Sequence, residues 1–191
     1  MLKDNLGVLV IDLQPAYALS STSSISRYLM RDVLAFLQAQ PEDVRIVVVY
    51  VNEELSGDTQ EDVRGFWAEH GASNELLERC DWVEKSYAFA RGWMDNGVSH
   101  DDIVEVLRRM RSLRLTDSRD FEAGQLEALS AEGSALLDPL FLEPDLEQLL
   151  PRLRERSWQT CGGGRDECLR EVELVLQSAN VSYERLDTLT Y

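Results

Sequence analysis

The segment from Trp158 to Leu169 places one thiol, that of Cys168, at the start of a helix and directly after a glycine-rich turn. Apolar residues recur at helical spacing from Leu169 until Asn180. A cysteine in the first helical turn lies near the positive end of the helix dipole and near free backbone N–H groups, which favour thiolate over thiol. Three consecutive glycines, 162–164, let the preceding N–H groups face a substrate oxygen. The pattern predicts that Cys168 is a nucleophile.

Two acidic neighbours, Asp166 and Glu167, disfavour a thiolate, so we expect a cation close to the sulfur. Asp12 and Lys85 each end an apolar segment that reads as a strand. Ligands of an open parallel sheet bind beyond the carboxyl ends of its strands, where Asp12, Lys85 and Cys168 would share one edge. Asp12 can then take the thiol proton and return it to a leaving amine, while Lys85 supplies the cation.

The elements that would position these residues alternate between strand and helix. Strands are expected at residues 6–13, 45–51, 82–85, 157–161 and 181–186, and helices at residues 25–38, 101–113, 145–156 and from Cys168 to Asn180. Ser99 is the expected cap of the second helix. This order predicts a three-layer α/β/α domain with a mainly parallel, Rossmann-like sheet.

Composition narrows the class of protein. The 191 residues are 44% hydrophobic and show no compositional break, which indicates a single domain spanning residues 1–191. A net charge of −16 argues against nucleic-acid binding, and the basic residues at 108–111 and 114 are expected on a solvated helix face. No apolar run is long enough to span a membrane, and an odd number of cysteines, three, favours a reducing compartment, so a soluble cytoplasmic protein is expected.

Three motifs resemble those of the isochorismatase-like cysteine hydrolases. Val10 to Tyr17 resembles the family's opening Asp-x-Gln-x-x-Phe, with Tyr17 as the aromatic residue. Lys85 to Phe89 resembles the family's lysine segment, and Gly162 to Leu169 is similar to its Gly-Val-x-Thr-Asp-x-Cys-Val, with Arg165 at the Thr position. The resemblance covers roughly residues 5–93 and 146–191, and leaves residues 94–145 as an insertion.

The resemblance implies a cofactor-free enzyme with the isochorismatase-like fold. Its catalytic triad would be Asp12, Lys85 and Cys168, with a cis peptide at Gly163 and Gly164 and an oxyanion hole formed by the N–H groups of Gly164 and Cys168. Cys168 would form an acyl-enzyme that water hydrolyses. True isochorismatases in the family lack this cysteine, so its retention favours a small-molecule amide or ureide as substrate.

Several further residues are expected to contact the substrate: Gln14, Tyr17, Tyr87, Trp93 and Arg165. The tryptophans near the lysine segment, at 67, 82 and 93, could form an aromatic wall for a flat substrate or pack in the core. No metal is expected, because the chain reads Asn52-Glu53-Glu54 where the nicotinamidase branch carries an Asp-x-His pair. His70 is expected to be a turn or packing residue.

A different class of function stays open. The chain could keep this fold as a non-catalytic protein with a binding, assembly or phage-associated structural role, in which the acidic surface and the 94–145 insertion make the contacts. Family members commonly form homo-oligomers, and Leu140, Phe141 and Leu142 are the apolar residues that could form such an interface.

Overall fold

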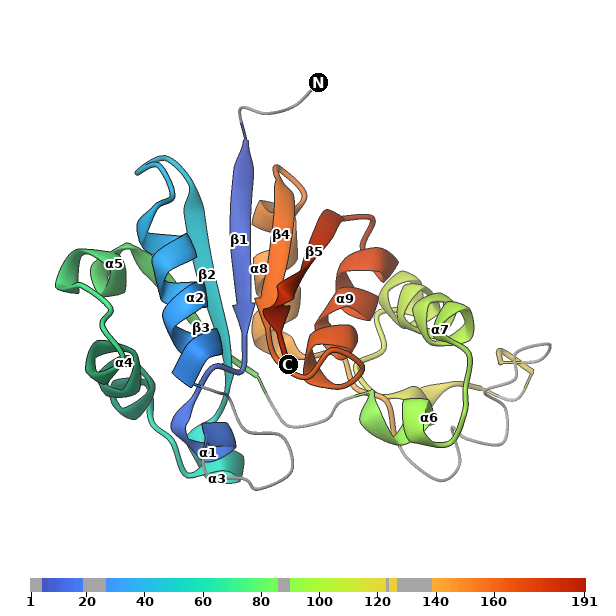
Figure 1. Cartoon of the computed structure of the whole chain (residues 1–191). Helices are drawn as coiled ribbons and strands as arrows, with labels where there is room; N and C mark the ends of the chain where they lie inside the picture. Colours follow the sequence, from blue (N-terminus) through green and yellow to red (C-terminus); the bar gives the residue numbers. More distant parts are fainter. Residues whose placement is uncertain (1–4, 19–26, 86–89, 123, 127–138) are drawn as a thin grey trace.

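A five-stranded, entirely parallel sheet forms the centre of the computed structural model, which describes residues 5–18, 27–85, 90–122, 124–126 and 139–191. The strands are β1 (Leu6–Ile11), β2 (Arg45–Val51), β3 (Cys80–Lys85), β4 (Ser157–Gly162) and β5 (Ser182–Thr190). Their order across the sheet is β3-β2-β1-β4-β5 (Figure 1). The parallel α/β fold predicted from the sequence is confirmed.

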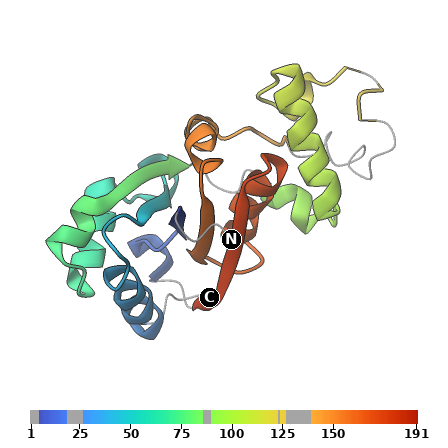
Figure 2. The ribbon, with the colours of Figure 1, turned by 90° about the horizontal axis from the view of Figure 1, so that it is seen from above.

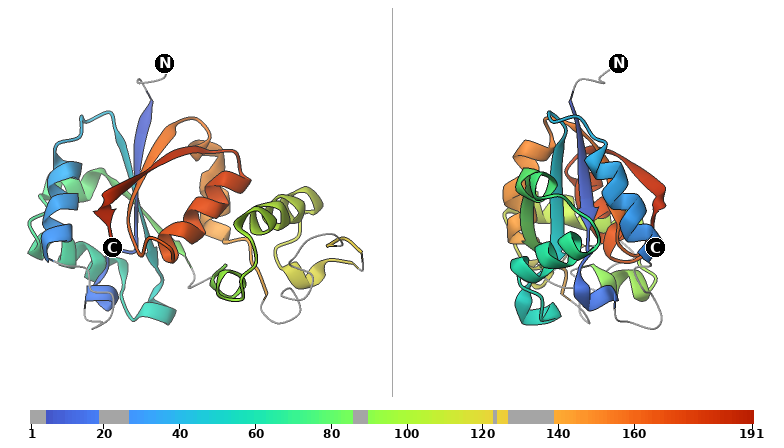
Figure 3. Two further views of the ribbon diagram at one scale, coloured as in Figure 1. Left: turned by 45° about the vertical axis from the view of Figure 1, so that its right-hand side comes forward. Right: turned by 60° about the vertical axis from the view of Figure 1, so that its left-hand side comes forward.

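Helices connect the strands on both faces of the sheet. They are α1 (Pro15–Ala18), α2 (Arg27–Gln38), α3 (Glu53–Ser56), α4 (Gln60–Glu69), α5 (Asn74–Arg79), α6 (Arg91–Asp95), α7 (His100–Leu113), α8 (Pro144–Leu153) and α9 (Cys168–Ser178), with a 3-10 turn, η1, at Ser118–Asp120. The right-hand view of Figure 3 shows α2 and α8 on opposite sides of the strands. The molecule therefore has three layers.

Alternation along the strands divides the core in two. Val8 and Val10 of β1 pack with α2, α4 and α5, whereas Leu9 and Ile11 pack with α7, α8 and α9. Successive strand side chains point to opposite faces, and both sets here are apolar because helices cover both faces. This double burial explains why β1 and β2 read as continuous apolar runs.

Most element boundaries follow the predicted ones, and the departures lie where local signals are weak. Ser99 caps α7 as expected, since its side chain accepts a hydrogen bond from the Asp102 N–H. β5 runs farther than predicted, to Thr190, and α4 and α5 form between residues 58 and 79, where the sequence shows only short helical patterns. The sequence pattern also predicts a helical piece near residues 125–129, and residues 127–129 lie outside the described residues.

The segment predicted as an insertion, residues 94–145, contains α7, which lies together with α6 beyond α9 from the rest of the sheet (Figures 1 and 2). Arg111 of α7 contacts Glu147 of α8 at 2.6 Å and donates to the Ser178 hydroxyl at the end of α9. The expectation that this arginine belongs to a solvated face is wrong, because it joins three helices. Nothing described in the chain is a helix both long and apolar enough to cross a bilayer.

The apolar triplet expected at an oligomer interface is mostly core. Leu140 and Leu142 are buried with α7, α8 and α9. Phe141 alone is exposed, and the Arg119 guanidinium lies over its ring at 5.7 Å. Leu140 and Leu142 are therefore corrected to packing residues.

Candidate active site

The strand order reverses between β1 and β4, and the three residues expected to be catalytic lie at the carboxyl ends of strands around this point. From β1 the chain adds β2 and β3 on one side, then returns to add β4 and β5 on the other. Such a switch point opens a crevice where loops leave in opposite directions. Asp12 follows β1, and the turn before Cys168 follows β4.

Asp12 is held in a backbone conformation that few residues adopt. Its φ angle is +49°, in the left-handed region, and its N–H donates to the Val49 carbonyl at 2.9 Å. Aspartate tolerates this region better than most residues, but the conformation still carries strain. Residues in strained conformations cluster at functional sites, because the surrounding fold must hold them in place. The side chain of Asp12 is completely buried.

Lys85 lies at the end of β3 and reaches Asp12 across β2. Its Nζ is 3.0 Å from Oδ2 of Asp12, and both side chains are buried. Beyond this contact, within the described chain, neither the ammonium nor either carboxylate oxygen has a hydrogen-bond partner. Burial lowers the pKa of Lys85, but the charges of Asp12 and Glu171 outweigh it and leave the pKa raised. The amine is therefore a cation at neutral pH.

The glycine turn after β4 brings the chain back to α9. Gly162 has a φ angle of +85°, and a Cβ there would lie 2.4 Å from the Ile11 carbonyl oxygen. Gly163 follows at +26° and donates its N–H to the same carbonyl at 2.7 Å. No described peptide bond is cis, so the cis peptide expected at Gly163 and Gly164 is wrong. The positive φ angles reverse the chain in its place.

Cys168 begins α9 as predicted, and its side chain is half-buried. The Gly164 N–H donates to its Sγ at 3.1 Å. The Cys168 N–H has no hydrogen-bond partner in the described ranges. These are the two N–H groups expected in the oxyanion hole. In this structure the Gly164 N–H donates to the sulfur instead. The charges of Asp12 and Lys85 both act on the thiol, so the three residues lie together.

The protonation state of Cys168 differs from the expectation. Burial raises the pKa of the thiol and the Asp12 charge raises it further, while Lys85 and the Gly164 N–H only partly oppose them. The sequence signal for a resting thiolate at the helix start is therefore overridden by desolvation. The site at rest holds a neutral thiol beside the Lys85 ammonium and the Asp12 side chain.

The two acidic neighbours of Cys168 are both exposed to solvent. Asp166 is exposed, and Glu167 forms an ion pair with Arg91 of α6 at 3.1 Å. Arg91 also binds Asp95. The flanking acids are thus solvated or paired, and Lys85 is the cation that acts on the thiol.

Gln14 does not have the role expected from the motif. Its side-chain amide donates to the carbonyl of Val51 at 3.3 Å and to Asp58 at 3.0 Å, and its oxygen accepts from the Val51 N–H at 2.7 Å. Asp58 also accepts from the Ala16 N–H. Both amide donors are used, so Gln14 is corrected from a substrate ligand to a clamp that fixes the loop after Asp12 to the end of β2.

The expected aromatic wall is not formed. Trp67 and Trp82 contact each other edge to face at 5.3 Å in the core beneath α2, α4 and α5. Trp93 is buried in the other core, on the opposite face of the sheet, and is corrected to a packing residue. Tyr87 lies outside the described residues.

Tyr17 and Arg165, two of the residues expected to contact the substrate, differ in how far they are buried. Tyr17 is half-buried, and its phenol interacts with that of Tyr191. Arg165 is exposed, and its guanidinium donates to the Asp187 carbonyl on β5 at 2.9 Å. Substrate contact by Tyr17 or Arg165 stays a prediction.

Two residues that sequence reasoning missed lie at the site. The Tyr191 N–H donates to the Gly163 carbonyl, and the charges of Cys168 and Asp12 act on its phenol. Glu171 is buried one turn after Cys168 in α9, and its charge acts on Lys85. Glu171 carried one available signal, a carboxylate on the face of α9 that otherwise reads as apolar.

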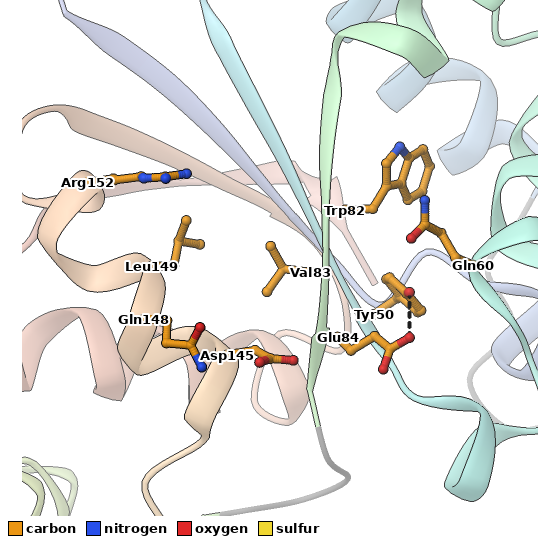
Figure 4. Close-up of a pocket in the computed structure, with 9 residues that line it drawn as sticks. All are labelled: Tyr50, Gln60, Trp82, Val83, Glu84, Asp145, Gln148, Leu149 and Arg152. Carbon is orange, nitrogen blue, oxygen red and sulfur yellow. Dashed lines mark hydrogen bonds between the residues drawn. The ribbon is translucent and has the colours of Figure 1, made fainter.

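A separate cavity of about 390 Å³ lies along the edge of β3, with Trp82, Val83 and Glu84 in its wall (Figure 4). Figure 4 shows Arg152, Leu149 and Gln148 of α8 on one side of the strand and Gln60 and Tyr50 on the other. The Tyr50 hydroxyl donates to Glu84 at 2.9 Å. None of the three expected catalytic residues lines this cavity, so it is distinct from the thiol site.

Throughout the described ranges, no group of three or more His, Cys, Asp or Glu side chains is placed so that it could hold a metal ion.

Comparison with family models, with curated proteins and with solved structures gives no match for this chain. The interpretation of the site therefore depends on its own residues.

Proposed function

We propose that this protein is an isochorismatase-like cysteine hydrolase that cleaves the C–N bond of a small amide or ureide through a Cys168 acyl-enzyme. One observation carries the proposal. At the switch point of the sheet, a half-buried thiol lies with a fully buried Asp12–Lys85 ion pair whose polar atoms have no other partner in the described chain. Buried polar groups are almost always hydrogen-bonded, so an unsatisfied cluster beside a nucleophile favours a catalytic role.

The proton inventory of the site fits this chemistry. The Asp12 carboxylate takes the S–H proton as Sγ forms a bond to the substrate carbonyl carbon, and Lys85 balances the negative charge. The carbonyl oxygen becomes an oxyanion, which the N–H groups of Gly164 and Cys168 would stabilise. Donation by Gly164 to the thiol at rest would then pass to the oxyanion.

The second half of the reaction returns every group to its starting state. The oxyanion re-forms the carbonyl as the C–N bond breaks, and Asp12 gives its proton to the departing amine. This leaves a thioester on Cys168. Asp12 then takes a proton from water, whose oxygen attacks the thioester carbon, and Sγ leaves and is reprotonated. The products are an amine and a carboxylic or carbamic acid, and no cofactor is consumed.

The neutral resting thiol suits a mechanism in which proton transfer accompanies attack. Because burial raises the pKa of Cys168, a free thiolate is scarce at neutral pH and a base within reach becomes necessary. Apart from the contact of Oδ2 with the Lys85 ammonium, the Asp12 carboxylate has no hydrogen-bond partner in the described chain. Its position is therefore that of a general base.

The proposal is tested by screening amides and ureides for release of ammonia or amine. Wild type should release product from at least one compound, Cys168→Ala should lose at least about a thousandfold of that rate, and mass spectrometry should detect acyl-Cys168 in the wild type. Cys80→Ala is the matched control, because Cys80 is a buried thiol at the opposite end of β3 from Lys85. Its activity should equal that of the wild type.

Two outcomes contradict the proposal. Product release that survives in Cys168→Ala would show that another group does the chemistry. No release from a broad panel, combined with iodoacetamide labelling of Cys168 no faster than of Cys80 and Cys161, would instead favour the non-catalytic binding or assembly role.

A further inference from the structure

Glu171 is a buried carboxylate for which the proposed triad has no use. It lies three residues after Cys168 in α9, and residues at this spacing share a helix face. Its exposed fraction is 2%. Glutamate is almost never this deeply buried unless it is paired, since removing a carboxylate from water is costly. A compensating interaction is therefore expected.

The compensation comes from groups of the active site. One Glu171 oxygen accepts the Ala90 N–H, at the start of α6, at 2.8 Å. The charged groups that face Glu171 are Lys85 from β3, Asp12 from the end of β1 and Arg91 from α6. Lys85 in turn is acted on by Asp12, Glu171 and Cys168. One ammonium is thus shared among two carboxylates and a thiol.

A second buried glutamate on the same helix shows the contrast. Glu173 forms ion pairs with Arg185 and Arg170 and accepts a hydrogen bond from the Thr160 hydroxyl. Glu171 forms no ion pair within 4.0 Å among the described residues. Burial, with a contribution from Asp12, raises its pKa to about 7, although Lys85, the Ala90 N–H and Arg91 oppose the change. Glu171 therefore changes charge in the neutral range, and Glu173 is a matched control.

We propose that Glu171 is a second anionic partner of Lys85 and that its charge sets the pH range in which Cys168 reacts. When Glu171 is ionised, it shares the positive field of Lys85 with the sulfur, so Lys85 stabilises the thiolate less. When Glu171 is protonated, Lys85 stabilises the thiolate more fully. Glu171 is a positioning residue in this scheme, since it acts through Lys85. The inference rests on the proposed function.

The test measures the rate of Cys168 alkylation by iodoacetamide from pH 5 to pH 9 in wild type and in Glu171→Gln. Glutamine can still accept the Ala90 N–H, so the substitution removes only the charge. The ratio of the variant rate to the wild-type rate should stay near one where Glu171 is already neutral. Above about pH 8 it should rise roughly three- to tenfold, less than the gain in thiolate alone, because nucleophilicity falls with the thiol pKa.

Glu173→Gln serves as the control, and its rate ratio should not vary with pH across the same range. A ratio for Glu171→Gln that is constant with pH, or that falls above pH 8, overturns the inference while leaving the proposed function intact if wild-type Cys168 still labels faster than Cys80 and Cys161. If wild-type Cys168 labels no faster than those two thiols at any pH, the proposed function fails and this inference fails with it.

A second measurement covers a variant that does not fold. NMR titration of wild-type protein carrying carboxyl-labelled glutamate should show one carboxyl group that titrates near pH 7. This resonance should move when Cys168 is alkylated, because the two groups share Lys85. Absence of a glutamate titrating in the neutral range overturns the inference without any variant.

Discussion

Asp12 and Lys85 form a buried ion pair whose remaining polar atoms lack partners in the described chain. Desolvating two charges is costly, and a well-packed apolar pair at the same place is often equally or more stable. Stability alone therefore does not explain why this ion pair is buried here. Its position beside Cys168 is explained by a role in the chemistry of the thiol. The same reasoning applies to the left-handed backbone of Asp12, which aims the carboxylate at the cost of strain.

A double-mutant cycle measures how strongly the two charges depend on each other. Lys85→Met leaves a buried carboxylate unpaired, and we expect it to lower the free energy of unfolding by about 3 to 5 kcal/mol. Asp12→Asn leaves Lys85 with only Glu171 and should also destabilise. The double variant should lose less than the sum of the two single losses. Urea denaturation of the four proteins at pH 7 gives each value.

If the two losses of unfolding free energy are strictly additive, Asp12 and Lys85 do not stabilise each other. The conclusion that they form a coupled, buried ion pair would then be wrong. A matched comparison is Arg31→Met, because Arg31 forms its ion pair with Asp32 at the surface. Its loss should be below about 1 kcal/mol.

At the scale of elements, the turn from β4 into α9 determines where the thiol lies. Gly162 passes so close to β1 that a Cβ would meet the Ile11 carbonyl, and the Gly163 N–H bonds to the same carbonyl. The turn therefore ties the start of α9 to the end of β1. This connection keeps Cys168 and Asp12 in register.

Gly162→Ala should destabilise the protein by about 3 kcal/mol or more, since the residue would need a positive φ angle and would clash with β1. Gly65→Ala in α4 is the control, because a Cβ there meets nothing within 4 Å. It should be neutral or stabilise by up to about 1 kcal/mol. Thermal and urea unfolding check both. A Gly162→Ala protein as stable as the wild type would contradict the close approach of the turn to β1.

Strands and the thiol position were predictable because their signals are local. β1 and β2 are continuous apolar runs, and Cys168 follows a glycine turn and precedes a periodic apolar face. The cis peptide, the aromatic wall and the role of Gln14 were not predictable in this way. Each depends on which face or neighbouring strand a side chain meets. Trp67 and Trp93 flank the lysine segment in the sequence, yet they lie on opposite faces of the sheet.

Glu171 shows a different limit of sequence reasoning. Its place on the apolar face of α9 indicates burial, but helical spacing alone does not reveal that the start of α6 contacts it. The ion pair between Arg91 and Glu167 could not be predicted either, because it forms only where α6 packs near the start of α9. The missed residues are those that depend on contacts between distant segments.

At the scale of the whole molecule, charge is unevenly balanced. The chain carries 35 acidic and 19 basic side chains, a net charge of −16. Several of the arginines are used between helices, as Arg111 is between α7, α8 and α9. The acidic excess therefore remains largely uncompensated, and like charges repel each other more in the compact state than in the unfolded chain.

Added salt should consequently raise the free energy of unfolding at pH 7. Screening shortens the Debye length from about 14 Å at 0.05 M to about 4 Å at 0.5 M ionic strength and weakens the repulsion among the acidic side chains. Exposed ion pairs such as Arg31–Asp32 are screened too, but each contributes less than about 1 kcal/mol. Buried pairs such as Asp12–Lys85 are affected least. Urea denaturation at several NaCl concentrations gives the sign directly.

The same salt series at pH 4.5 separates repulsion from other effects of salt. The isoelectric point is about 4.5, so the net repulsion vanishes there, and a stabilisation that arises from repulsion should shrink strongly. Salt effects on apolar burial would persist at both pH values. If salt destabilises the protein at pH 7, attractive pairs outweigh the repulsion, and the acidic side chains must be more closely matched to the arginines than the net charge implies.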